Sequence, residues 1–231
     1  MRRVFGIALG VALGLASQAA RACELALILA VDVSGSVDTK EYDIQMRGLA
    51  EALRDGSISE ALVLKEAAVQ VIQWTGRGRH RVSVPWTHIR NFDDTDQLAD
   101  VIEADVRIWR NFSTALGEAL SFAANQFDAV PECTRRVIDV SGDGRSNEGV
   151  RPPELHATMQ AAGITVNALA IEAYDKGLSE YFWQEVITGP GAFAMRAANF
   201  QEYPDTIRRK LLREITKQLS ELNQGDQRDN L

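Results

Sequence analysis

Histidine is scarce in this 231-residue sequence and net positive charge is absent, and each of these facts argues against a class of function. The three histidines, His80, His88 and His156, are scattered, and no pair has the helical spacing of zinc ligands, which argues against a histidine-bound zinc ion. The 25 lysines and arginines face 32 aspartates and glutamates, so the basic field that a general nucleic-acid or anionic-membrane binder needs is missing. The sequence around Ser34 lacks the Gly-x-Ser-x-Gly pattern of serine hydrolases.

Long apolar runs are also rare, and the one at the N-terminus is short. Arg2 and Arg3 precede an apolar stretch over residues 4–16, and the pattern Ala-Arg-Ala ends at Ala22. A charged start, a short apolar middle and an Ala-x-Ala exit predict a secretory signal peptide over residues 1–22, with cleavage after Ala19 as the alternative. Its removal leaves 22 basic against 32 acidic side chains, a net charge of −10. We therefore expect a periplasmic or secreted protein without an integral membrane span after signal removal.

The order of expected elements predicts an α/β fold. Strands are expected at residues 25–31, 67–74, 81–86, 136–140, 164–171 and 192–196, and helices at 40–53, 95–106, 113–127, 153–162, 178–187 and 200–219. Alternating strands and helices with one hairpin favour a doubly wound, mostly parallel sheet with one antiparallel edge strand and helices on both faces. We expect one domain over residues 23–219, followed by a polar C-terminal tail over 220–231.

Oxygen-bearing side chains follow two of the expected strands. Asp32, Ser34 and Ser36 come directly after the first strand, Thr114 stands at the start of a helix, and Asp143 follows a later strand. Carboxyl ends of parallel strands meet at one edge of a sheet, and an oxygen-only set suits a hard cation such as Mg²⁺, with Mn²⁺ or Ca²⁺ possible. Taken singly, the serines would also serve as helix caps, Thr114 as an N-cap and Asp143 as part of a turn.

Five side chains leave at least one of the six positions around Mg²⁺ open. Two carboxylates balance the charge of a divalent ion, and the neutral hydroxyls leave it electron-poor. The open position therefore favours an anionic ligand, such as an Asp or Glu of a protein partner.

The ordered set of these residues resembles the metal-ion-dependent adhesion site, or MIDAS, of von Willebrand factor type A domains. The pattern is Asp-x-Ser-x-Ser after the first strand, a threonine before an amphipathic helix, and Ser-Gly-Asp-Gly after a later strand. The wider strings at residues 23–27, 85–87 and 137–144 look like a secreted bacterial branch of unknown function. The resemblance implies a Rossmann-like fold over residues 23–219 and an ion held by Asp32, Ser34, Ser36, Thr114 and Asp143, some of them through water. Ser141-Gly142 stands where many relatives have a threonine just before the aspartate, so the residues that support the ion's ligands depart from the family pattern here.

The only two cysteines, Cys23 and Cys133, are spaced like the two aspartates. Cys23 lies nine residues before Asp32 and Cys133 ten before Asp143. If both aspartates lie at one end of adjacent parallel strands, both cysteines lie together at the other end, which predicts a disulfide. The alternative makes Cys23 a lipid-modified N-terminus, but Arg21 is a poor residue for a lipidation signal.

Two functions remain in competition. The first is a non-enzymatic, metal-dependent, adhesion-type module that captures an acidic residue of a partner protein. The second is a Mg²⁺-dependent phosphohydrolase with Asp32 as the phosphoryl acceptor, but Ser34 stands where such enzymes need a second carboxylate as general acid. On the hairpin formed by the second and third strands, Arg77, Arg79 and Arg81 are expected to help select an acidic partner.

Overall fold

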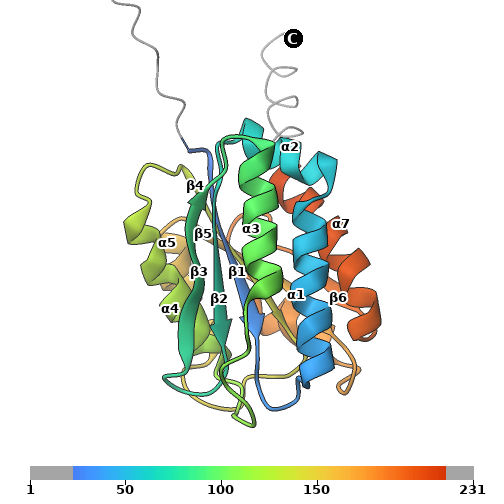
Figure 1. Cartoon of the computed structure of the whole chain (residues 1–231). Helices are drawn as coiled ribbons and strands as arrows, with labels where there is room; N and C mark the ends of the chain where they lie inside the picture. Colours follow the sequence, from blue (N-terminus) through green and yellow to red (C-terminus); the bar gives the residue numbers. More distant parts are fainter. Residues whose placement is uncertain (1–22, 217–231) are drawn as a thin grey trace, which may run out of the picture.

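The protein has a six-stranded sheet between two layers of helices, as the computed structural model in Figure 1 shows for residues 23–216. The strand order is β3-β2-β1-β4-β5-β6. The strands are β1 (Leu25–Asp32), β2 (Ala68–Trp74), β3 (His80–His88), β4 (Arg135–Gly142), β5 (Ile164–Ile171) and β6 (Ala194–Ala197). All named pairs are parallel except β2 with β3, which confirms the predicted doubly wound sheet with one antiparallel edge strand. The predicted signal peptide and C-terminal tail lie outside the described residues.

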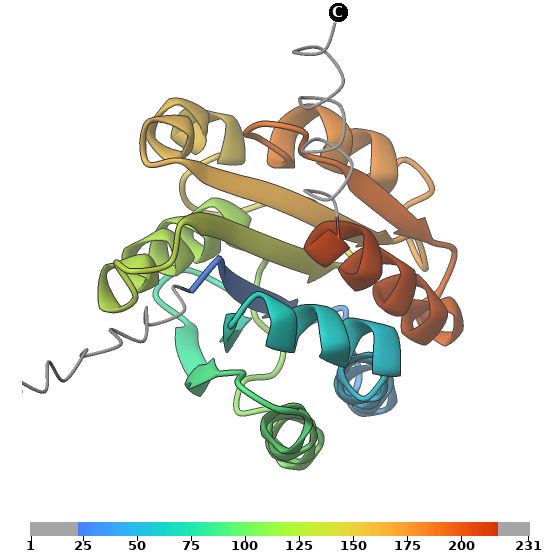
Figure 2. The same cartoon turned by 90° about the horizontal axis from the view of Figure 1, so that it is seen from above.

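Helices cover both faces of the sheet, as Figure 2 shows from above. One layer contains α1 (Thr39–Leu53), α2 (Gly56–Leu64), α3 (Phe92–Ala104) and α7 (Tyr203–Thr216). The other contains α4 (Leu116–Gln126), α5 (His156–Ala161), α6 (Leu178–Tyr181) and its π-helical continuation η3 (Phe182–Val186). Short 3₁₀ turns lie at η1 (Phe127–Ala129), η2 (Pro152–Leu155) and η4 (Phe200–Glu202).

Strand β1 is central and buried at every position. Its leucines and Val31 pack on the α1, α3 and α7 side, whereas Ala26, Ile28 and Ala30 pack on the α4 side. Alternate side chains of a strand point to opposite faces, so an unbroken apolar run is what a strand covered on both sides requires.

Helices α2, α3 and α4 differ from the expectation in ways that bear on the site or on how the sequence is read. The sequence analysis missed α2, whose apolar residues surround the helix instead of forming one stripe and whose start depends on the Asp55 cap. Helix α3 begins at Phe92 after the Asn91 cap, three residues earlier than expected. Helix α4 begins at Leu116 instead of residue 113, which leaves Thr114 in the preceding loop.

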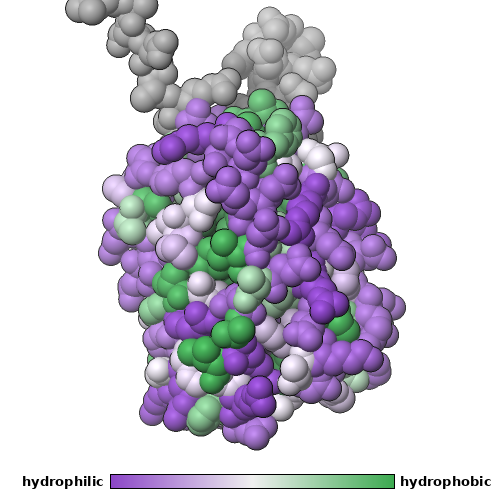
Figure 3. Space-filling model, viewed as in Figure 1, coloured by the Kyte–Doolittle hydropathy of each residue, from purple (hydrophilic) through white to green (hydrophobic). Residues whose placement is uncertain are grey.

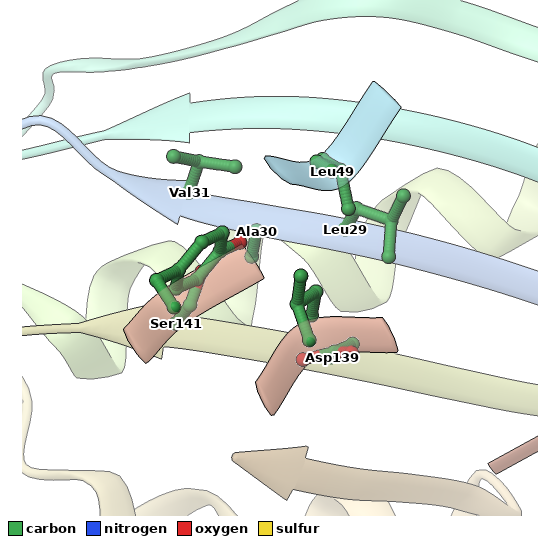
Figure 4. A pocket seen from close by; sticks show the side chains of 8 residues that line it. Leu29, Ala30, Val31, Leu49, Asp139 and Ser141 are labelled. Carbon is green, nitrogen blue, oxygen red and sulfur yellow. The ribbon is translucent and has the colours of Figure 1, made fainter. Parts of the chain in front are cut away.

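A buried polar layer joins β4 to α7. Lys210 Nζ lies 2.5 Å from Asp139 Oδ1 and 3.7 Å from Glu214 Oε2, and all three side chains are almost fully inaccessible to solvent. Asn167 of β5 donates a hydrogen bond to Glu214. Figure 4 shows Asp139 and Ser141 of β4 beside a narrow packing gap that α7 also lines. Charged side chains are tolerated at this depth because their mutual attraction offsets the loss of hydration.

The disulfide joins Cys23, just before β1, to Cys133, just before β4. It lies at the amino ends of the two strands, as the spacing of cysteines and aspartates predicts. Within residues 23–216 no helix combines the length and apolar character needed to cross a bilayer.

Candidate metal centre

The carboxyl ends of β1 and β4 bring two aspartates together. The parallel register pairs Val31 with Ser141, so Asp32 and Asp143 follow at the same edge of the sheet. Between them, Gly142 leaves room for the first carboxylate, because a Cβ at this position would lie only 3.0 Å from Asp32 Oδ2. The close approach of the two acids therefore depends on a residue without a side chain.

The loop after β1 links the two carboxylates through its serines. The Ser34 backbone N–H donates to Asp32 Oδ1 at 2.7 Å, and Ser34 Oγ lies 3.2 Å from Ser36 Oγ. Ser36 Oγ donates in turn to Asp143 Oδ1 at 2.7 Å. Helix α1 is capped by Asp38, so the alternative in which the serines cap this helix is wrong.

Thr114 is held beside the loop that follows Asp143. Its backbone N–H donates to Asn147 Oδ1 at 2.9 Å, and its carbonyl accepts from the Asn147 N–H at 2.9 Å. Its hydroxyl faces this loop, because a Cβ on Gly144 would lie 3.6 Å from Thr114 Oγ1. The N-cap of α4 is Ala115, so the interpretation of Thr114 as a helix cap is wrong and its hydroxyl stays available.

The two carboxylates are buried with too little positive charge around them. Asp32 Oδ2 and Asp143 Oδ2 are both inaccessible to solvent and have no hydrogen-bond partner. Burial, followed by repulsion from Asp143, raises the pKa of Asp32 to about 8, and burial also raises the pKa of Asp143. Two buried acids that each present a free oxygen beside hydroxyl groups fit a divalent cation, which would offset both charges.

This donor set differs from a soft metal site. Within residues 23–216, histidine, cysteine and carboxylate side chains form no cluster of three that could hold a metal. A cation at the carboxyl ends of β1 and β4 would therefore depend on hydroxyl oxygens from Ser34, Ser36 and Thr114 as well as on the two aspartates.

Arg107 supports the first loop, and the sequence analysis missed it. Its Nη2 donates to the carbonyl oxygens of Val33 at 3.0 Å and Ser34 at 2.8 Å. The guanidinium also lowers the pKa of Asp32 and of Asp143, although less than burial raises them. No motif marks Arg107 or Asn147, since both act on backbone groups whose positions only the folded chain defines.

The three arginines of the β2–β3 hairpin, Arg77 and Arg79 in its turn and Arg81 in β3, have different surroundings. This turn adjoins the Thr114 loop, because the Ala115 N–H donates to the Thr75 carbonyl at 3.0 Å. Arg81 is largely buried and pairs with Asp105 at 2.7 Å, so it is engaged inside the protein. Arg77 is 65% exposed and pairs with Glu118, and the half-buried Arg79 lies over the Phe112 ring at 3.9 Å. Of the three, Arg77 is the most exposed.

Solved structures of low sequence identity share this fold. Proximal thread matrix protein 1 from the mussel byssus is 17% identical, with a TM-score of 0.63 and a match covering 83% of this chain and 47% of that protein. This mussel protein has also been solved with a zinc-occupied MIDAS motif. A von Willebrand factor type A protein from Catenulispora acidiphila is 16% identical, with a TM-score of 0.58 and coverage of 83% and 43%.

A match of nearly full length is an aerotolerance-related membrane protein from Bacteroides fragilis. It is 18% identical, with a TM-score of 0.54 and coverage of 84% of this chain and 99% of that one. The chain spans less than half of the mussel and Catenulispora proteins. At these identities the likeness shows the fold alone, and the fold is that of von Willebrand factor type A domains.

No curated protein matches the sequence. A family model does match, over residues 22–219, and its description is "Protein of unknown function (DUF1194)". Because the match covers most of the 231 residues, the chain belongs to the DUF1194 family, which here has a von Willebrand factor type A fold.

Proposed function

We propose that this protein is a non-enzymatic, metal-dependent, adhesion-type binding module. Asp32, Ser34, Ser36, Thr114 and Asp143 would hold a divalent cation, Mg²⁺ or in its place Mn²⁺ or Ca²⁺. When bound, the cation would supply an open coordination position for an Asp or Glu side chain of a partner protein. The zinc-occupied site of the mussel relative supports cation binding in this fold.

One observation carries the proposal: both buried aspartates present an oxygen without a partner. A buried carboxylate oxygen without a hydrogen bond is costly, and a pair of them is more so. The surrounding hydroxyls would donate to the carboxylates when no ion is present and would turn their lone pairs to an ion when one is. Arg107 and Asn147 fix the backbone on either side, so the donors would need little rearrangement.

We further propose that residues 1–22 are a signal peptide, that residues 23–219 are the binding domain, and that the protein is periplasmic or secreted. The support is the disulfide, because such bonds persist in oxidising compartments.

The test compares wild type with Asp143→Ala and with the matched control Asp175→Ala. Asp175 belongs to the loop after β5 and pairs at 2.6 Å with Arg145, which is two residues from Asp143, so replacing Asp175 disturbs the same loop without removing any of the five proposed ligands. Calorimetric titration with Mg²⁺, Mn²⁺ and Ca²⁺ should give one site in wild type and in the control, and none in Asp143→Ala. Partners captured from an envelope extract in Mg²⁺ should be released by EDTA. Capture that persists in EDTA would refute the proposal.

The phosphohydrolase alternative has its own readout. A screen of phosphate esters in Mg²⁺ should show no release of phosphate that depends on Asp32. Turnover that is lost in Asp32→Asn would establish the enzymatic alternative and overturn the binding module.

A further inference from the structure

The loop between α3 and α4 exposes large apolar side chains beside the aspartates. Residues 105–113 form neither helix nor strand, and in this segment Val106 is 65% exposed, Ile108 51% and Phe112 37%. Figure 3 shows hydrophobic side chains interrupting a mostly hydrophilic surface toward the lower end of the molecule, the end where Figure 1 places this loop. We call these three side chains the apolar ridge.

The ridge is exposed although its backbone is firmly held. Asp105 accepts hydrogen bonds from Gln73 and Arg81 through its carboxylate and from Tyr42 through its carbonyl. The Val106 carbonyl accepts from the same two side chains of β2 and β3. A loop whose polar groups are satisfied inside the protein while bulky apolar groups face water is a sign of an interaction surface.

The ridge adjoins the proposed metal site directly. The Gly35 N–H, between the two site serines, donates to the Phe112 carbonyl at 2.8 Å. Arg107, between two ridge residues in the sequence, holds the carbonyls of Val33 and Ser34. A partner side chain that reaches the cation would therefore bring its sequence neighbours over the ridge.

The charges around the site differ from one side to the other. Arg79 stacks on Phe112, and Arg107 and Arg110 belong to the ridge loop itself. On the α1 side lie acidic groups, with Glu41 accepting from the Tyr174 hydroxyl at 2.9 Å and from the Asp38 N–H. In a protein with a net charge of −7, this local basic and apolar edge suits a partner that is both acidic and apolar.

We propose that the apolar ridge binds bulky apolar side chains of the same partner segment whose Asp or Glu reaches the cation. The occupant is thus an exposed segment of another protein in which an acidic residue stands within a few positions of large apolar ones, with further negative charge toward Arg79 and Arg110. This inference rests on the proposed function and adds the chemistry of the partner. The acidic residue supplies attachment, and the apolar neighbours supply selectivity.

The experiment selects binders from a displayed library of random 12-residue peptides, using the whole secreted protein in Mg²⁺ and in EDTA. Wild type should enrich peptides with Asp or Glu next to Leu, Ile, Phe or Trp, and only in Mg²⁺. The ridge variant Val106→Ser/Ile108→Ser/Phe112→Ser should still require the acidic residue, lose the apolar preference and bind the best wild-type peptide at least about tenfold more weakly.

A matched control replaces three apolar side chains of similar exposure elsewhere, in Leu64→Ser/Phe92→Ser/Val101→Ser, which are 62%, 55% and 51% exposed in wild type. This control should select the same peptides as wild type. Equal thermal midpoints for the two triple variants would show that folding is not the cause of any difference.

The outcomes separate the two proposals. Mg²⁺-dependent enrichment of acidic peptides without an apolar preference would leave the proposed function standing and overturn the ridge. An apolar preference that survives in the ridge variant would overturn it as well. No enrichment in Mg²⁺ over EDTA would refute both. Light scattering tests whether the ridge mediates self-association instead. If wild type forms dimers and the ridge variant is monomeric, the inference is overturned.

Discussion

Replacing Asp32 by Asn should stabilise the metal-free protein while it abolishes the response to metal. Asn keeps an Oδ1 acceptor for the Ser34 N–H and places an NH₂ group where the Asp32 Oδ2 has no partner. The change therefore removes a buried charge with little loss of shape or hydrogen bonding. Most substitutions at a buried polar residue destabilise, so a gain in stability would be a distinctive result.

The size of the effect follows from the pKa of Asp32. Its carboxyl has a pKa of about 8 in the folded protein against 3.8 ordinarily, so the unfolded chain releases the proton more readily. Stability then falls as pH rises from about 4 to about 8 and changes little above that range. At pH 7 the loss is at most about 4 kcal/mol, at about 1.4 kcal/mol for each pH unit. We expect Asp32→Asn to recover about 2 kcal/mol, since its amide and Asp143 remain desolvated.

The assay is urea unfolding between pH 5 and 8, in EDTA and in excess Mg²⁺. In EDTA the variant should be more stable than wild type at pH 7, and the difference should shrink toward pH 5. In Mg²⁺ at a hundred times the dissociation constant, wild type should gain about 2.7 kcal/mol and the variant almost nothing, so the order reverses.

The control is Asp175→Asn, because the Arg145 guanidinium lowers the pKa of this aspartate. It should show neither the gain in EDTA nor a lost response to Mg²⁺. A variant at Asp32 that is less stable than wild type in EDTA at pH 7 would refute the reasoning about the two buried acids.

Three further outcomes concern stability. Lys210→Met leaves buried carboxylates without their cation and should lower the free energy of unfolding, measured in urea, by about 3–5 kcal/mol. Adding Asp139→Leu should restore much of this loss, and an equal loss in the double variant would count against the pairing. Replacing Cys23 and Cys133 by Ser removes a disulfide between residues 110 apart in the sequence and should lower the free energy of unfolding by up to about 4–5 kcal/mol. An unchanged urea midpoint would contradict the disulfide. Gly117→Ala would drive a methyl group into the Val150 carbonyl and should lower the thermal midpoint by several degrees, whereas a neutral result would contradict the close packing of α4.

The sequence predicts the fold well because buried strands and amphipathic helices leave periodic patterns. Strand β1 was identified from its unbroken apolar run, and the disulfide from two spacings along parallel strands. Helix α2 was missed because its apolar residues do not gather on one face. The start of α4 was misplaced for a different reason, because no side chain caps the helix.

The five residues proposed as cation ligands could be selected because their side-chain chemistry is visible in the sequence. Arg107 and Asn147 were not, because each acts on backbone atoms of a distant loop. The pairing of Arg81 with Asp105 was also hidden, since it joins segments 24 residues apart that only the folded loop brings together. Sequence reasoning thus selected the proposed ligands and missed the residues that hold their loops in place.

The strand pair β1–β4 is fastened differently at its two ends. At the amino ends a covalent link joins the two strands, whereas at the carboxyl ends Asp32 and Asp143 are connected only through the hydroxyls of Ser34 and Ser36, and a cation would join them more firmly. Loss of the ion would therefore lower the local stability at the carboxyl ends of β1 and β4 and leave the disulfide-linked amino ends unaffected. We expect hydrogen exchange in chelator to speed up in the segments after Asp32 and Asp143, while amides near Cys23 and Cys133 keep their protection.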